Sequence, residues 1–113
     1  MNLLDFAKRY TSTYELVTIP SLDLEVRIHI LTMKEQEEVL KLQNSCSVGG
    51  EVVSLNRLAY QIVKRFITDA DGNSLVENVS EELFGQQRVE LVSALITAYH
   101  SVQQKNQETP DPN

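Results

Sequence analysis

The sequence predicts an α+β fold: a mainly α-helical single domain with an N-terminal antiparallel β-hairpin. Apolar and polar residues alternate strictly over residues 22–30, a pattern typical of a strand with one buried and one solvated face. Apolar residues recur at helical spacing within residues 54–68 and 80–104, which indicates two amphipathic helices. A chain of 113 residues suits one domain, which we expect to occupy residues 1–104.

Composition restricts the classes of function. The chain has 10 Lys and Arg against 16 Asp and Glu, a net charge of −6. This balance argues against a general nucleic-acid binder and against docking on an anionic membrane face, because both need cations. With one Cys no internal disulfide forms, and no apolar run approaches the length of a membrane span. We read no signal peptide and expect a soluble, acidic, cytoplasmic protein.

The predicted hairpin covers residues 14–30. Residues 14–19 are rich in β-forming types, and Pro20-Ser21 can turn the chain into the alternating segment. An isolated hairpin is marginal in water, so we expect this one to pack on helices or to pair with another chain. Before it, residues 2–11 carry an apolar residue at each helical turn, which predicts a short helix.

Three helices are expected after the hairpin. Thr32 and Glu35 form a capping box that begins a surface helix over residues 32–44. A loop with Gly49-Gly50 follows, and then a helix over residues 54–68. Ser80 caps the last helix, over residues 80–104, with a break expected near Gly85. Residues 105–113 contain two prolines and no large apolar side chain, which predicts a disordered tail.

One partial motif suggests calcium. Asp69, Asp71 and Asn73 have the spacing that opens an EF-hand loop, but Ser74 and Ser80 stand where that loop needs Gly and Glu. Acidic residues next to Gly are common in ordinary turns, so we interpret this segment as a turn.

Catalysis is not expected. Cys46 is the only thiol, and His29 and His100 are the only imidazoles. No nucleophile–base–orienter set and no glycine-rich phosphate loop is visible. We therefore predict no catalytic residue, no cofactor and no metal ligand.

The best functional signal is the helix predicted over residues 54–68. Its apolar arc is wider than one packing partner needs, so part of it serves either the core or a partner surface. Its basic residues either form a solvated face or dock an acidic partner, such as another copy of this chain through Glu35, Glu37 and Glu38. The candidate partner-binding residues are Tyr60, Val63, Ile67, Arg57, Lys64 and Arg65.

A family resemblance covers roughly residues 14–104. Its parts are a strand LEVRIHI running into the helix start LTMKE, then a helix NRLAYQIVKRFI followed by DADGNSL, and finally VSEEL ahead of a last helix. This order of elements resembles the small tail assembly chaperones of long-tailed, siphophage-type bacteriophages.

The resemblance implies a non-enzymatic protein that binds the tape measure protein, keeps it soluble and helps to assemble tail tube subunits. It implies a homo-oligomer in the host cytoplasm, absent from the mature virion. It also implies a longer form made by −1 frameshifting, and Gln104-Lys105-Asn106 can be encoded by a slippery CAA AAA AAC. The alternatives are an acidic regulatory or inhibitor protein that binds another protein, and a small Cys-His enzyme.

Overall fold

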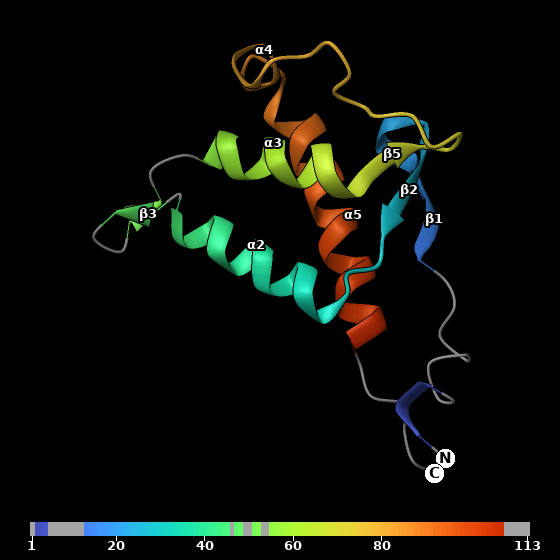
Figure 1. Ribbon diagram of the computed structural model, residues 1–113. Helices are drawn as coiled ribbons and strands as arrows, with labels where there is room; N and C mark the ends of the chain where they lie inside the picture. Colours follow the sequence, from blue (N-terminus) through green and yellow to red (C-terminus); the bar gives the residue numbers. More distant parts are fainter. Residues whose placement is uncertain (1, 5–12, 46, 49–50, 53–54, 108–113) are drawn as a thin grey trace.

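A three-stranded antiparallel sheet forms one side of the molecule, and the helices extend from it (Figure 1). The computed structural model describes residues 2–4, 13–45, 47–48, 51–52 and 55–107. Its helices and sheet confirm the predicted α+β class with an N-terminal hairpin. The third strand of the sheet comes from residues 67–69, about forty positions after the hairpin.

The predicted hairpin is present. Strand β1 (Tyr14–Ile19) pairs with β2 (Leu24–His29) in a register that places Tyr14 opposite His29 and Ile19 opposite Leu24. The short 3-10 helix η1 (Pro20–Leu22) connects them, with Asp23 at a φ of 48°. Proline fits there because its fixed φ suits the first position of a helical turn.

A third strand corrects one sequence prediction. Helix α3 (Leu55–Phe66) ends two residues before the expected boundary, and β5 (Ile67–Asp69) pairs with the second edge of β2. The strand order is therefore β1-β2-β5. Ile67 lies opposite Ile28 and is fully buried, and the β-branched pair Ile67-Thr68 suits an extended backbone.

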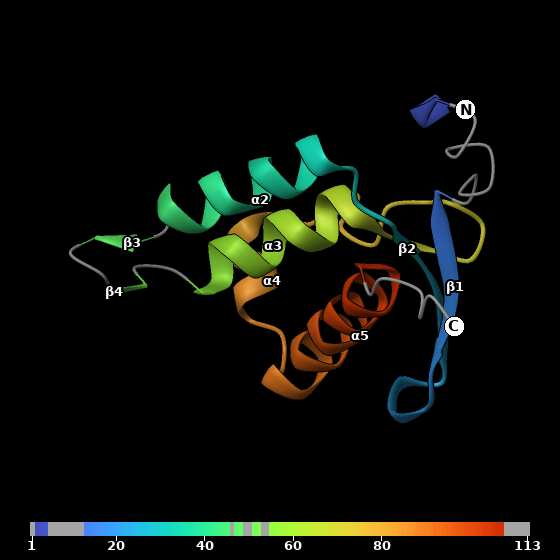
Figure 2. The ribbon, with the colours of Figure 1, turned by 90° about the horizontal axis from the view of Figure 1, so that it is seen from below.

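The other helices lie near their predicted positions. They are α2 (Met33–Ser45), α4 (Glu81–Gly85) and α5 (Val89–Gln107). Figure 2 shows α2 and α3 side by side, with the sheet at one end and the short strands β3 (Ser47–Val48) and β4 (Glu51–Val52) at the other. This two-stranded ribbon replaces part of the expected loop, and Gly49-Gly50 lies outside the described residues.

Two predicted helix starts are confirmed. The Thr32 hydroxyl accepts from the Glu35 amide at 3.2 Å, and the Thr32 amide donates to Glu35 Oε1 at 2.9 Å. These two bonds are the reciprocal capping box. The Ser80 hydroxyl likewise accepts from the Leu83 amide at 3.1 Å at the start of α4.

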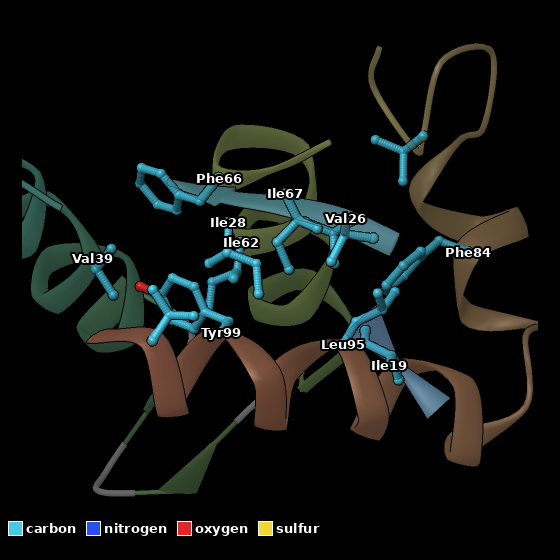
Figure 3. Close-up of a cluster of buried hydrophobic side chains, with 13 residues drawn as sticks. Ile19, Val26, Ile28, Val39, Ile62, Phe66, Ile67, Phe84, Leu95 and Tyr99 are labelled. Atoms are coloured by element: carbon cyan, nitrogen blue, oxygen red, sulfur yellow. The ribbon is translucent and has the colours of Figure 1, made fainter. Parts of the chain in front are cut away.

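The core fills the space between the sheet and the helices α3 and α5 (Figure 3). Its most completely buried side chains are Val26, Ile28, Val63 and Ile67. Helix α2 contributes only Val39 to the buried set, as expected for a surface helix. Helix α2 therefore makes few core contacts.

The C-terminal end of the chain differs from expectation where it is described. Helix α5 continues to Gln107, and Lys105 Nζ lies 2.8 Å from Glu15 Oε1 on β1, so the start of the predicted tail is ordered helix. Residues 108–113 lie outside the described residues, as do 5–11 of the predicted first helix. Leu3 and Leu4 are helical and exposed.

Candidate functional site

Two of the predicted partner-binding residues belong to the core. Val63 is 1% exposed and Ile67 is 0% exposed. The wide apolar arc of the sequence is covered because α3 packs against α5 and continues directly into β5, which pairs with the central strand β2. The prediction that these two side chains form a partner surface is therefore wrong for the folded chain.

Three more of the predicted residues face the segment around α4. The Tyr60 hydroxyl donates to the carbonyl of Val79 at 2.7 Å, and its partly buried ring meets the Phe84 ring edge-on at 5.4 Å. Lys64 Nζ lies 5.9 Å from the centre of the Tyr60 ring. Arg57 Nε lies 3.5 Å from Glu81 Oε1. The contacts of Tyr60 and Arg57 tie α3 to residues 79–84.

Arg65, the last of the six, is exposed on another side of the molecule. It lines a small cavity beside Arg27 on the outer face of the sheet. The structure therefore does not bring the six predicted residues together in one site.

A groove between α2, α3 and α5 is the strongest candidate site. It consists of two adjoining cavities of about 470 and 360 Å³, and Gln43, Ile62 and His100 line both. Besides these shared residues, the first is lined by Leu31, Gln36, Val39, Leu40, Tyr99, Gln103 and Gln104, and the second by Leu55, Leu58, Ala59, Val92, Ser93, Ile96 and Thr97.

The groove lining is mostly apolar, and its polar members are glutamines, hydroxyl residues and His100. None of the side chains that line either cavity is Asp, Glu, Lys or Arg, although these types make up 23% of the chain. Leu40 and Leu55 stay 54% and 73% exposed beside it. Depletion of charge around exposed apolar side chains is typical of the centre of a protein interface.

Tyr99 forms part of the groove floor. Its ring stacks on that of Phe66 at 6.1 Å, and the hydroxyl points toward Val39 of α2 (Figure 3). Burial, with a smaller contribution from the Glu35 carboxylate, raises the pKa of Tyr99 to about 12. A phenol with the ordinary pKa of 10.0 is already neutral at physiological pH, so the shift extends the neutral range of Tyr99 into alkali.

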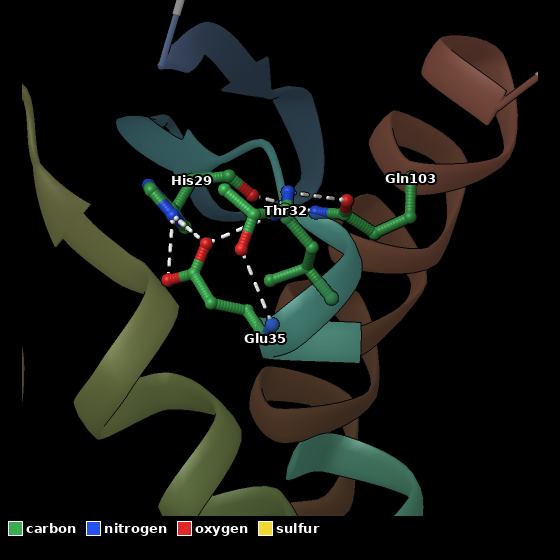
Figure 4. Close-up of polar contacts among 5 residues, drawn as sticks. His29, Thr32, Glu35 and Gln103 are labelled. Carbon is green, nitrogen blue, oxygen red and sulfur yellow. Dashed lines mark hydrogen bonds and ion pairs between the residues drawn. The ribbon is translucent and has the colours of Figure 1, made fainter. Parts of the chain in front are cut away.

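A polar cluster fixes the end of the groove nearest the sheet (Figure 4). Gln103, which is 7% exposed, donates from Nε2 to the carbonyl of His29 at 2.6 Å and accepts at Oε1 from the amide of Leu31 at 3.1 Å. The two bonds join α5 to the connection between β2 and α2. They therefore set where α2 leaves the sheet and where the groove begins.

Glu35 anchors the other side of this cluster. Its two carboxylate oxygens lie 2.8 and 2.9 Å from His29 Nε2, and it accepts from the Thr32 amide (Figure 4). Partial burial acts to raise the pKa of Glu35, but the hydrogen bonds from Thr32 and His29 outweigh it and lower the pKa below its ordinary value. The His29 ring also stacks on Phe66 at 5.9 Å.

The candidates for chemistry are separate in space or engaged in structure. His29 pairs with Glu35, His100 is an exposed residue of the groove, and Cys46 lies outside the described residues. Asp69 Oδ1 accepts from the amides of Asp71 and Asn73, which confirms a turn. These amides are also the main cause of a lowered pKa at Asp69.

Two absences hold for the described part of the chain. No group of three or more His, Cys, Asp or Glu side chains there is placed to hold a metal ion. No helix within it has the length and apolar character needed to cross a membrane.

The sequence reading did not find the groove, although one signal was present. Residues 91–104 contain no Asp, Glu, Lys or Arg over fourteen consecutive positions, and every α5 residue that lines the two cavities falls among them. A surface helix normally carries charges on its solvated face. The absence of charges over these positions of α5 indicates that the side of this helix turned away from the core is also covered by another surface.

Comparisons with known proteins return no match: none of the family models, curated proteins or solved structures searched is similar to the chain.

Proposed function

We propose that this protein is a non-enzymatic phage tail assembly chaperone that binds a helical segment of the tape measure protein in the groove between α2, α3 and α5. The observation that carries the proposal is the uncharged apolar lining of the groove on an otherwise acidic chain. The order of elements that resembles small tail assembly chaperones supplies the identity of the client.

The shape of the site favours a helical client. Helices α3 and α5 form the floor and α2 one wall, which suits an amphipathic helix that inserts side chains at helical spacing. Leu40 and Leu55 offer exposed apolar contacts. Gln36, Gln43 and Gln104 place neutral amides at the groove, where they can hydrogen-bond polar groups at the edge of a bound helix without requiring a particular charge.

The remaining surface suits a solubilising role. A net charge of −6 opposes aggregation of the complex while the apolar groove is occupied. In this proposal the protein acts in the host cytoplasm as a homo-oligomer, helps to recruit tail tube subunits, and is left out of the mature virion.

Co-expression tests the proposal. The native gene, with an N-terminal affinity tag and its downstream genomic DNA, is expressed and the tagged protein is purified. We expect a long tape measure protein to co-purify, and to become insoluble when the chaperone gene is deleted. A tape measure protein that stays soluble alone and does not co-purify would contradict the proposal. Capture of a different protein would favour the acidic regulatory or inhibitor alternative.

The same expression experiment tests frameshifting. Gln104, Lys105 and Asn106 lie in the last turns of α5, so the proposed slippery codons fall inside ordered helix. We expect a second, longer tagged product that disappears when these three codons are recoded synonymously. A single product of the length given by this sequence would remove the frameshifted form from the proposal.

A further inference from the structure

Strand β1 leaves one edge of the sheet unpaired. The order β1-β2-β5 gives β1 a neighbour on one side, and within the described residues no main-chain hydrogen bond reaches its other side. Figures 1 and 2 show β1 on the side of the sheet away from β5. The β5 edge differs, because Thr68 forms a bridge with Ser74 there. An unpaired strand edge is a template for pairing with another chain.

The hydrogen-bond pattern of the hairpin determines which main-chain groups face the free edge of β1. The Ile30 amide donates to the Thr13 carbonyl at 2.8 Å, so these two residues form a hydrogen-bonded pair one position beyond the β1–β2 register. Such pairs alternate with pairs whose amides and carbonyls point away from each other. Tyr14, Leu16 and Thr18 therefore direct their main-chain groups outward. Their side chains are exposed, and that of Leu16 keeps 52% of its surface accessible.

The edge carries none of the features that usually prevent strand pairing. Edge strands are commonly protected by lysine, proline, a bulge or a charge that points inward. The β1–β2 register is continuous, and the six residues of β1 include neither lysine nor proline. The one charged residue of β1, Glu15, is engaged within its own chain by Lys105 at 2.8 Å and Asn106 at 3.3 Å. Its carboxylate is therefore not a free charge at the edge.

Two copies of β1 complement each other in an antiparallel register centred on Leu16. With Leu16 opposite Leu16 of the second copy, Tyr14 lies opposite Thr18 of that copy. The three outward-directed residues of each strand then meet the three of the other, so every outward amide has a carbonyl acceptor. The two leucine side chains meet at the two-fold axis and cover each other's exposed apolar surface.

The neighbouring two-fold registers fit less well. A register centred on Glu15 would place two carboxylates directly opposite each other, which is unfavourable. A register centred on Val17 would place Tyr14 opposite Pro20, which has no amide to donate to the Tyr14 carbonyl. In the register centred on Leu16, Glu15 lies opposite Val17 and no like charges of the two β1 strands are opposed.

We propose that two copies of this chain form a two-fold dimer by pairing the outer edges of their β1 strands, antiparallel and centred on Leu16. The two three-stranded sheets then join into one continuous sheet. This inference goes beyond the homo-oligomer of the proposed function, because it assigns a surface and a register. The pairing uses no residue that lines the groove, so its failure would leave client binding unaffected.

Opposite charges at position 16 test the two-fold relationship in the purified full-length chain. Sedimentation velocity over a concentration series should show a monomer–dimer equilibrium for the wild type. Leu16→Lys and Leu16→Glu should each weaken dimerisation roughly tenfold, because like charges then oppose each other at the axis. An equimolar mixture of the two variants should restore it. Arg27 lies opposite position 16 on β2, so circular dichroism and thermal unfolding first confirm that each variant is folded.

Disulfide cross-linking tests the register. In a Cys46→Ser background, Leu16→Cys should form a covalent dimer with oxidised glutathione, because the Cα atoms of a hydrogen-bonded antiparallel pair lie about 5.5 Å apart, within disulfide range. Thr18→Cys is the matched control on the same exposed face of β1. Its two copies would lie four positions apart along the paired strands, about 14 Å, and should not cross-link.

The proposal is overturned if the wild-type chain stays monomeric over the whole concentration series. It is overturned equally if folded Leu16→Lys dimerises as strongly as the wild type, if the mixture of charge variants restores nothing, or if the two Cys variants cross-link to the same extent. A chain that stays monomeric alone, but whose β1 amide signals shift when the tape measure protein is added, would assign the edge to that protein instead.

Discussion

Gln103 and His29 are 74 positions apart in the chain, yet the side-chain amide of Gln103 donates to the main-chain oxygen of His29 at 2.6 Å. The side-chain oxygen of Gln103 accepts from the main-chain amide of Leu31. One side chain therefore satisfies the His29 carbonyl and the Leu31 amide, which lie where β2 ends. This contact joins the last helix to the sheet and to the start of α2. It therefore positions the end of the groove that we propose as the client site.

Gln103→Ala should lower the free energy of unfolding by about 1–3 kcal/mol, because it leaves the His29 carbonyl and the Leu31 amide without their partner. Chemical denaturation measures this change, and the Leu31 amide should exchange faster with solvent. Gln104→Ala is the matched control, since Gln104 is the exposed neighbour on the same helix. Equal effects of the two variants would contradict the positioning role.

The Glu35 cluster predicts an acid-sensitive contribution to stability. The pKa of Glu35 is lowered in the folded chain, so its ionised form is favoured by folding. That contribution is present above its ordinary value of 4.5 and is lost as the pH falls through the lower pKa of the folded state. In Glu35→Gln the free energy of unfolding should therefore fall less steeply as the pH decreases below 4.5.

Unfolding free energies measured at a series of acid pH values test this expectation. Glu38→Gln, an exposed change on the same helix, should leave the acid limb in place. An unchanged acid limb in Glu35→Gln would show that the cluster does not contribute as described.

Tyr99 predicts a loss of stability in alkali. Its pKa is raised from 10.0 to about 12 in the folded chain, so the unfolded chain loses this proton first. Stability should therefore decrease between about pH 10 and about pH 12, because in this range the folded state holds the proton that the unfolded state has released. Tyr99→Phe should remove this component, and absorbance titration of the phenolates should show one fewer late-titrating group.

Local patterns predicted the segments whose structure depends on near neighbours in the chain. The alternation of residues 22–30 and the turn at Pro20 were enough for the hairpin, because register and facing follow from a period of two. The capping side chains of Thr32 and Ser80 satisfy amides only three residues away, so their roles could be identified from spacing.

Long-range contacts decided the features that the sequence left open. Ile67 continues the apolar stripe of the preceding helix, and only its pairing with Ile28 of β2 makes it a strand residue. The groove depends on α2 lying beside α3 with Val39 alone buried, which leaves Leu40 exposed. Arg27 of β2 and Arg65 at the end of α3 line the same cavity only because the fold brings these two elements together. No spacing in the sequence therefore indicates this cavity.

The central claim is that the client binds in the groove, and exposed leucines beside it allow a direct measurement. Leu40→Glu and Leu55→Glu each place a charge there, while Val89→Glu is a matched control outside it. Leu55 and Val89 are both first residues of helices and are 73% and 78% exposed, so a Glu suits each helix start equally.

The measurement is the amount of tape measure protein that co-purifies with each variant, normalised to the tagged chain, with circular dichroism confirming that each variant is folded. We predict roughly a tenfold or greater loss for the two groove variants and no loss for Val89→Glu, because burying an unpaired charge in an interface is costly. Retention of the client at the wild-type level by both folded groove variants would contradict the account.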